Sequence, residues 1–261
     1  MDLVIFAGPV IVTEAHKRID WRRRDVRIVP IVFDGSSNGK ALAESLRDSA
    51  GRILPNLLAK YAPGITPDQI ALASFSAGYG LLDPILAVPE DRARVTATCF
   101  ADSVFLAGDP RTGQGGPVHP GAVAFGAEAV DGDKLLVSTS AHSSDGSYLT
   151  GMQSWTLTWE AIRKESGCYC EPSRVKPKAP VPEPELGFFQ LGSSCYWGDY
   201  GNALTHGEHN ALSAAIWQAY LSPWLAGDRG MLPALLGAAL GAAFGFGYAA
   251  VQKLRSNRGR A

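Results

Sequence analysis

The sequence lacks a strong net charge and is poor in charged residues. Lysine plus arginine number 24 against 25 aspartate plus glutamate, which gives a formal net charge of −1, and charged residues make up 19% of the chain. Proteins that bind nucleic acids ordinarily carry a basic excess or stripe. Nucleic acid is therefore excluded as an expected partner, and the short basic run at 22–24 is interpreted as a solvated turn.

Cysteine is scarce, and its spacing excludes the common cysteine motifs. The chain has 4 cysteines. One residue separates Cys168 from Cys170, which is closer than the C-x-x-C spacing of redox and zinc motifs. Cys99 lies in an apolar run and is expected to be buried. A disulfide from Cys195 to Cys168 or Cys170 stays open.

A secretory signal is also lacking. Residues 1–12 contain a short apolar run, but Asp2 stands where a basic region would precede it, and charged residues follow at 14–18. We interpret this run as a core strand. No repeat of fixed period is visible.

The far end of the chain has no charge over 231–252, between Asp228 and a basic tail. A helix of this length spans about 33 Å, enough for a bilayer core. Gly237, Gly241 and Gly245 would place a smooth stripe on one face, which favours close packing of helices and self-association in lipid. Residues 228–261 are therefore predicted to form a single membrane anchor, with the side on which the body lies left open. The alternative is a buried C-terminal helix of a soluble cytoplasmic protein.

The remaining residues, 1–227, have the pattern of one α/β domain. Apolar residues make up 46% of the chain, enough for a large core. Strand-like and helix-like runs alternate, which predicts a mainly parallel central sheet with helices on both faces. A proline-rich stretch, 171–186, is expected to be a surface loop within the domain. The predicted strands are 3–6, 26–33, 69–75, 95–101, 134–140 and 187–194, and the predicted helices are 40–61, 77–87, 148–165 and 209–225. Pro55 is expected to kink or split the first of these helices.

The segment 69–80 carries the clearest chemical signal. Its apolar run ends in Ser74-Phe75-Ser76-Ala77-Gly78, and a helix-like stretch follows directly. This is the pattern of a nucleophile elbow, G-x-S-x-G, with Ser74 in place of the first glycine. Small residues are needed two positions before and after the nucleophile, because the sharp turn brings them against neighbouring backbone. Ser76 is therefore the predicted nucleophile, and the Ala77 amide is a predicted oxyanion donor.

A second oxyanion donor is expected from the loop after strand 26–33. Its glycines allow backbone amides to approach a carbonyl oxygen, so we propose the amide of Gly35 or Ser36. A phosphate-binding loop is excluded, because the glycines are one residue too close and Ala41 stands where Ser or Thr would bind magnesium.

The general base is expected late in the chain, after the last strand. His206 lies in the segment before the predicted helix 209–225, and His209 at its start, so His206 is the predicted base and His209 the alternative. The H-x-x-H pair with Glu208 could instead bind a metal, but no further ligand cluster appears, and no metal is predicted. For the acid we favour Asp102, with Asp145 as the alternative; Asp109 and Asp199 remain open.

The residues SFSAG, ADS and THGEHNAL together resemble the α/β-hydrolase-fold serine hydrolases over about residues 26–225. The chain order Ser, Asp, His is that of this superfamily. The resemblance implies no cofactor and a reaction of the ester, amide or thioester hydrolysis type. We expect carboxylic-ester hydrolysis of a small-molecule, lipid or acylated substrate through an acyl-enzyme. The alternatives are an amidase or peptidase with the same triad, and a non-catalytic membrane or assembly protein on a hydrolase scaffold.

Overall fold

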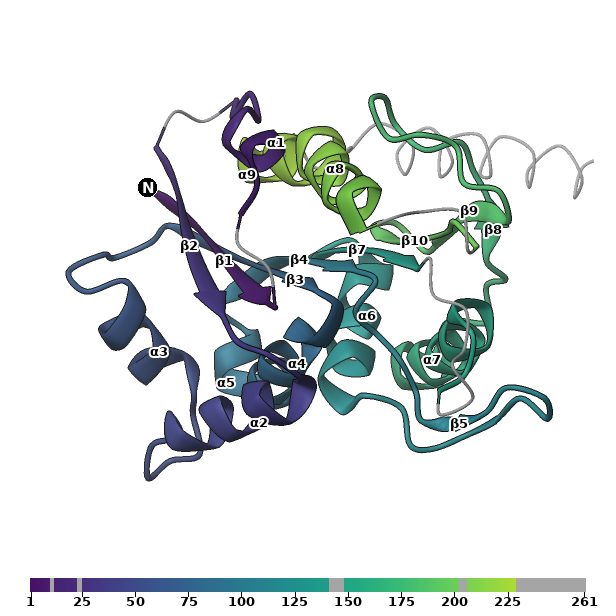
Figure 1. Cartoon of the computed structure of the whole chain (residues 1–261), viewed down its shortest axis with the longest axis horizontal. Helices are drawn as coiled ribbons and strands as arrows, with labels where there is room; N and C mark the ends of the chain where they lie inside the picture. Colours follow the sequence, from purple (N-terminus) through teal and green to yellow (C-terminus); the bar gives the residue numbers. More distant parts are fainter. Residues whose placement is uncertain (10–11, 23–24, 141–147, 202–205, 229–261) are drawn as a thin grey trace, which may run out of the picture. The chain divides into compact units, whose positions relative to one another are not determined.

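A mostly parallel sheet of eight strands forms the centre of the molecule (Figure 1). The computed structural model describes residues 1–9, 12–22, 25–140, 148–201 and 206–228. The chain divides into two units, Met1–Gly227 and Asp228–Ala261, and the first is described below. Its sheet has the order β2-β1-β3-β4-β7-β10-β9-β8, in which β9 alone runs antiparallel to its neighbours. The strands are β1 (Asp2–Gly8), β2 (Val26–Val32), β3 (Gln69–Phe75), β4 (Val95–Ala101), β7 (Leu135–Ser140), β8 (Ser173–Arg174), β9 (Gly187–Leu191) and β10 (Cys195–Asp199).

The central strands are buried on both faces, which is why they read as continuous apolar runs. Every residue of β1 is buried. Successive side chains point to opposite faces, so Leu3 and Ile5 enter one core while Val4 and Phe6 enter the other. Two separate hydrophobic cores therefore flank the sheet.

Helices cover both faces, as the alternating pattern predicted. The first core lies under α2 (Ser36–Ser45), α3 (Leu54–Tyr61), α4 (Tyr79–Ala87), α6 (Pro120–Asp131) and α7 (Gly151–Ser166). The second lies under α8 (His206–Ile216), the π-helical turn η2 (Trp217–Leu221) and α9 (Ser222–Leu225), with α1 (Glu14–Lys17) beside α8. The short helix α5 (Pro89–Arg92) and a small hairpin of β5 (Gly108–Asp109) and β6 (Gln114–Gly115) complete the described elements. The predicted α/β class is confirmed.

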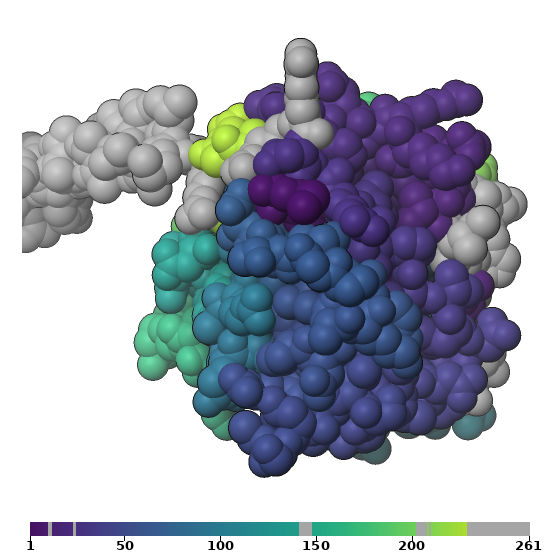
Figure 2. Space-filling model, turned by 90° about the vertical axis from the view of Figure 1, so that its left-hand side faces the viewer, coloured from purple at the N-terminus to yellow at the C-terminus, as the bar shows by residue number. Residues whose placement is uncertain are grey.

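One end of the sheet is the strand β2. Figure 2 views the molecule from this side, where N-terminal residues (purple) and the segment around α3 (blue) form the surface. β2 pairs with β1 and carries Pro30, which has no N–H to donate to a further strand. A proline in this strand is thus compatible with its place at the edge.

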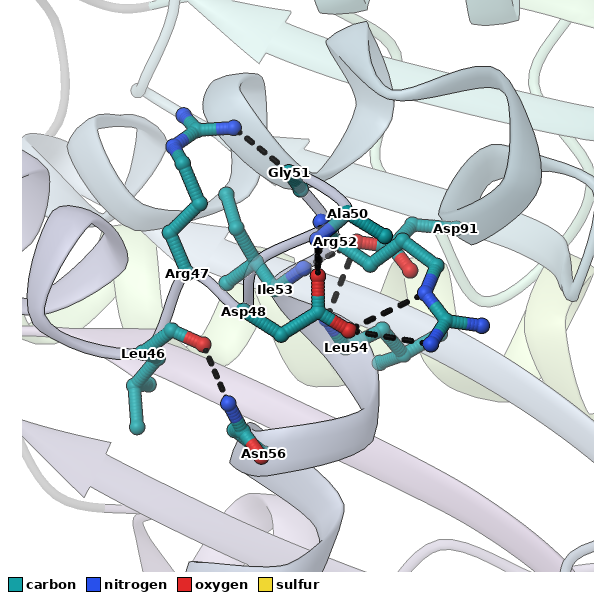
Figure 3. A network of polar contacts seen from close by, with 10 residues as sticks. All are labelled: Leu46, Arg47, Asp48, Ala50, Gly51, Arg52, Ile53, Leu54, Asn56 and Asp91. Atoms are coloured by element: carbon teal, nitrogen blue, oxygen red, sulfur yellow. Dashed lines mark hydrogen bonds and ion pairs between the residues drawn. The ribbon is translucent and has the colours of Figure 1, made fainter.

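The predicted helix 40–61 is two helices, because the chain breaks ahead of Pro55. Asp91, a buried residue of α5, accepts the backbone N–H groups of Ile53 at 2.6 Å and Leu54 at 2.9 Å (Figure 3). These are amides that the start of a helix leaves without an intrahelical partner. The carboxylate of Asp91 therefore fixes where α3 begins, and Pro55 lies in its first turn.

The end of the sheet differs from its prediction. The sequence indicated one strand over 187–194, but the chain turns at Gly192, with φ +61°, and returns as β10 to form an antiparallel hairpin with β9. β10 was missed. It is also the strand that pairs with β7, so it closes the parallel part of the sheet and ends at Asp199.

Two other expectations have definite outcomes. The cysteine pairing is Cys168–Cys170 and Cys195 is a buried free thiol, which decides the pairing that the sequence left open. The proline-rich segment is anchored: the Lys178 amide donates to the Tyr220 hydroxyl at 3.0 Å, and Val181 is buried in the second core.

No helix within the described residues is long and apolar enough to cross a membrane. The predicted span 231–252 lies outside the described residues, as do Gly237, Gly241 and Gly245. Membrane attachment accordingly stays a prediction.

Candidate active site

Ser76 stands at a sharp turn between β3 and α4. It is the first residue of the 3-10 turn η1 (Ser76–Gly78), which follows β3 directly and leads into α4. Its backbone has φ +48°, and among described residues only Ser76 and Asp102 share a positive φ without being glycine. A side-chain-bearing residue in this region is uncommon and costs conformational free energy. Such strain is the mark of a residue that the surrounding backbone forces into place.

The residues around Ser76 must be small for the turn to form. A Cβ atom on Gly78 would lie 2.0 Å from the carbonyl oxygen of Ala7 and 2.8 Å from the Cβ of Ser74. A Cβ on Gly80 would lie 2.2 Å from the carbonyl oxygen of Ser36. The end of β1 and the start of α2 therefore press directly on the turn and on α4. These two backbone contacts explain why positions 78 and 80 are glycine.

The strand register puts two carboxylates in line with Ser76. Phe75 pairs with Ala101, so Ser76 and Asp102 each follow a paired position on the neighbouring strands β3 and β4. The Asp102 amide donates to the Thr139 carbonyl at 2.8 Å, and Ser140 pairs with Asp199. The carboxyl edge of these four strands therefore carries, in order, Ser76, Asp102, Ser140 and Asp199. This is the edge at which parallel sheets of this kind place their chemistry.

Two histidines are held by contacts elsewhere. His16 is buried, with Nδ1 2.8 Å from Thr13 Oγ1 and Nε2 3.1 Å from Ser213 Oγ, and burial lowers its pKa to about 4. His119 donates from Nε2 to the Phe105 carbonyl at 2.9 Å, and its Nδ1 lies 3.9 Å from Asp83 Oδ2. His16 is thus engaged through both ring nitrogens and His119 through Nε2, while His142 lies outside the described residues.

The other predicted residues lie as follows. Ala77 is in η1, directly after Ser76, while Gly35 caps α2 and Ser36 begins it. α2 follows β2, which is separated from β3 by β1, yet the Ser36 backbone reaches the elbow helix at Gly80.

The histidines of the last segment begin a helix. The helix predicted to begin at 209 begins at His206, as α8. The expectation that His206 precedes the helix is therefore wrong, and His206 and His209 both belong to its first turn. Their side chains lie outside the described part of the chain, as do Asp145 and the rest of 141–147. Asp109 accepts the Arg111 amide at 2.9 Å within an exposed turn. Within the described residues, no three His, Cys, Asp or Glu side chains gather closely enough to hold a metal ion.

Asp199 is a buried carboxyl at the end of this row. Desolvation raises its pKa, and the nearby negative charges of Asp102 and Glu185 act in the same direction. The Gly201 amide, which donates to Asp199 Oδ1 at 2.9 Å, lowers the pKa and only partly offsets burial. The carboxyl thereby holds the turn at Tyr200 and Gly201 that leads toward α8.

A pH dependence of stability follows from Asp199. Its pKa is raised in the folded state above the unfolded value of 3.8, so the folded state binds the proton more tightly and ionisation destabilises it. Asp199→Asn removes the titration but keeps an oxygen that can accept the Gly201 amide. We expect this variant to gain stability over the native chain as the pH rises from about 4 to 7. Urea denaturation at both pH values measures the difference. An equal difference at both, or the same trend in the exposed control Asp133→Asn, would contradict the assignment.

Comparisons with known proteins identify no family for this chain. No protein-family model matches the chain, and no curated protein matches it. Among solved structures, the chain is similar to LpqC, a poly(3-hydroxybutyrate) depolymerase from Bordetella parapertussis, at 15% identity and a TM-score of 0.42, over 83% of this chain and 78% of that one. At this identity and score the likeness assigns neither a family nor an activity.

One cluster escaped the sequence analysis altogether. Asp83 of α4 accepts the Ala122 amide at the start of α6 at 3.0 Å, and the His119 ring packs 4.7 Å from that of Tyr79. Burial raises the pKa of Asp83, and the positive charge that His119 can carry opposes the rise. The cluster ties the elbow helix to α6. No local signal could reveal it, because its partners lie about forty residues apart.

Proposed function

We propose that the chain is a serine hydrolase of the α/β-hydrolase type that cleaves carboxylic esters through an acyl-enzyme. One observation carries the proposal: Ser76 has φ +48° on a turn between a buried parallel strand and a helix, and backbone of β1 and α2 packs closely against Gly78 and Gly80 just after it. This is the conformation that exposes a nucleophile at the top of such a sheet. A serine in a merely structural turn would gain nothing from this strain.

In the proposed reaction, Ser76 Oγ attacks the acyl carbon while His206 takes its proton. The Ala77 amide and the amide of Gly35 or Ser36 donate to the developing oxyanion. His206 then gives the proton to the leaving alcohol, and water, activated by the same histidine, releases the acid. Each step balances without a metal or cofactor.

The choice of His206 is supported by its position in the chain. His206 starts α8, in the segment that follows β10, the last strand of the parallel row. His209 remains the alternative.

Asp102 is the proposed acid. It follows the strand next to that of Ser76 and shares its unusual backbone conformation, φ +48°. The acid must orient the histidine and stabilise its charged form. Asp145, which comes after β7 in the sequence, and Asp199, the last residue of β10, are the alternatives.

A fluorophosphonate probe, which reacts with activated serines, tests the proposal. We expect one adduct at Ser76, mapped by mass spectrometry, and its loss in His206→Ala. Ser74→Ala is the matched control, because Ser74 is buried two residues away on β3 and should not affect labelling beyond small packing changes. A well-folded chain that takes no probe would overturn the proposal.

The unlabelled enzyme, assayed for turnover, separates the reaction classes. A panel of p-nitrophenyl esters and matching anilides distinguishes an esterase from an amidase with the same triad. Turnover of esters alone is the expected result, and faster cleavage of anilides would move the proposal to an amidase.

A further inference from the structure

The disulfide Cys168–Cys170 lies between the end of α7 at Ser166 and the start of β8 at Ser173, in the green part of Figure 1. Tyr169, between the two cysteines, is 96% exposed. The other two cysteines differ from this pair in burial. Cys99 and Cys195 are buried, and burial raises the pKa of each thiol to about 12. The chain therefore keeps two inert thiols inside and one disulfide at its surface.

This disulfide contributes little to holding the fold together. A cross-link stabilises a protein chiefly by closing a loop in the unfolded chain, and the effect grows with the loop length. Here the two cysteines are 2 positions apart in sequence. The segment has other anchors: Arg163 pairs with Glu171 at 2.8 Å, and the Cys168 amide donates to Ser166 Oγ at 3.3 Å. A structural purpose does not account for the bond.

Both cysteines of the pair are partly exposed, and a surface hollow adjoins Cys168. A surface hollow of about 330 Å³ is lined by Cys168 and Tyr169 together with the last turns of α7. Its charged side chains are Arg163, Lys164 and Glu160, and Glu171 pairs with Arg163, so the opposite charges offset one another.

A backbone contact distinguishes the two sulfurs. The amide N–H of Cys170 donates to Cys168 Sγ at 3.2 Å. An N–H donor stabilises a negative charge that develops on the sulfur it faces. Of the two, Cys168 is therefore the better leaving thiolate. Exposed disulfides are in general the labile and regulatory ones.

We propose that Cys168–Cys170 is a redox-active disulfide that exchanges with thiols in solution. The incoming thiolate attacks Cys170 Sγ and forms a mixed disulfide, while the electron pair of the broken S–S bond passes to Cys168 Sγ. A second thiolate then attacks the sulfur of the incoming molecule and releases the Cys170 thiolate. Two thiols are oxidised to one disulfide, and the protein pair is reduced to two thiols. The C-x-C spacing does this without the C-x-x-C motif.

Equilibration with glutathione tests the proposal in the full chain. The protein is incubated in reduced and oxidised glutathione at a range of ratios. Free thiols are then blocked with N-ethylmaleimide while the protein is folded, and the labelled cysteines are mapped by mass spectrometry. We expect both Cys168 and Cys170 to gain the label as the ratio becomes more reducing, with circular dichroism unchanged. Cys99 and Cys195 should stay unlabelled and serve as internal controls. A folded chain whose pair resists reduction across the range would overturn the proposal.

Single variants test which sulfur leaves. Cys170→Ser retains the Cys168 thiol, and Cys168→Ser retains the Cys170 thiol. At neutral pH we expect the Cys168 thiol to react with N-ethylmaleimide several-fold faster, because the Cys170 backbone amide survives the substitution and still faces it. Equal rates, or a faster Cys170 thiol, would overturn the order of attack. Neither measurement depends on hydrolase activity, so a chain without esterase activity could still pass both.

Discussion

Replacing Ser76 by alanine is expected to lower kcat/KM for an activated ester by at least about 10⁴-fold, because the nucleophile is lost and little catalysis remains. The residual rate should not fall further in the double variant Ser76→Ala, His206→Ala, since the two side chains act as a unit. Initial rates with p-nitrophenyl acetate measure both. A loss of less than tenfold would contradict Ser76 as the nucleophile.

The two inactive variants Ser76→Gly and Ser76→Ala are expected to differ in stability. Ser76 has φ +48°, where a side-chain-bearing residue is strained and glycine is not. Ser76→Gly is therefore expected to be more stable than Ser76→Ala by about 1 kcal/mol, while both lose activity. Urea denaturation gives the comparison.

An ordinary helical serine provides the control for this comparison. Ser45 is exposed at the end of α2, where its Oγ donates to the Leu42 carbonyl at 2.8 Å. At Ser45 alanine should be more stable than glycine, by about 0.5–1 kcal/mol. The sign of the alanine–glycine difference should thus reverse between the two positions. If glycine is no better than alanine at Ser76, the turn is not strained and the main support for the hydrolase proposal is lost.

The sequence allowed the α/β class and the sharp turn between strand and helix at Ser76 to be predicted, because their signals are local. β1, β3 and β4 are short apolar runs between turns, and Ser76 follows β3 within a run of small residues. Pro55 likewise marked the break between α2 and α3. Each prediction needed only neighbouring residues, whose backbone preferences decide the outcome.

What could not be predicted depends on strand order and on long-range contacts. β1, not β2, lies next to β3, so the end of β1 at Ala7 packs against Gly78, and no local pattern in the sequence marks this contact. The β9–β10 hairpin was not predicted, because its turn at Gly192 lies inside a run that is typical of a single strand. The position of Asp199 in the row with Ser76 depends on that hairpin. The disulfide pairing, too, depends on how α7 ends.

Among single methyl additions at the turn after β3, Gly78→Ala is expected to cause the largest loss of stability. Its Cβ would lie 2.0 Å from the Ala7 carbonyl oxygen and 2.7 Å from the Ala7 carbonyl carbon, both backbone atoms of β1. Neither can move away as a flexible side chain could, because β1 is hydrogen-bonded on both sides, to β2 and β3. Overpacking of this kind costs about 3 kcal/mol or more. We expect a loss of that size in urea denaturation, together with a loss of probe labelling at Ser76.

Gly116→Ala separates this effect from the ordinary cost of replacing a glycine. The nearest atom to a Cβ on Gly116 would be the Ala107 carbonyl oxygen at 3.4 Å, an ordinary contact. Its stability should therefore change by no more than about 0.5 kcal/mol, with labelling retained. A Gly78→Ala chain as stable as Gly116→Ala would mean that the end of β1 does not press on the turn. The strain at Ser76 would then have no source in the surrounding backbone, and the geometric reason for an exposed nucleophile would be gone.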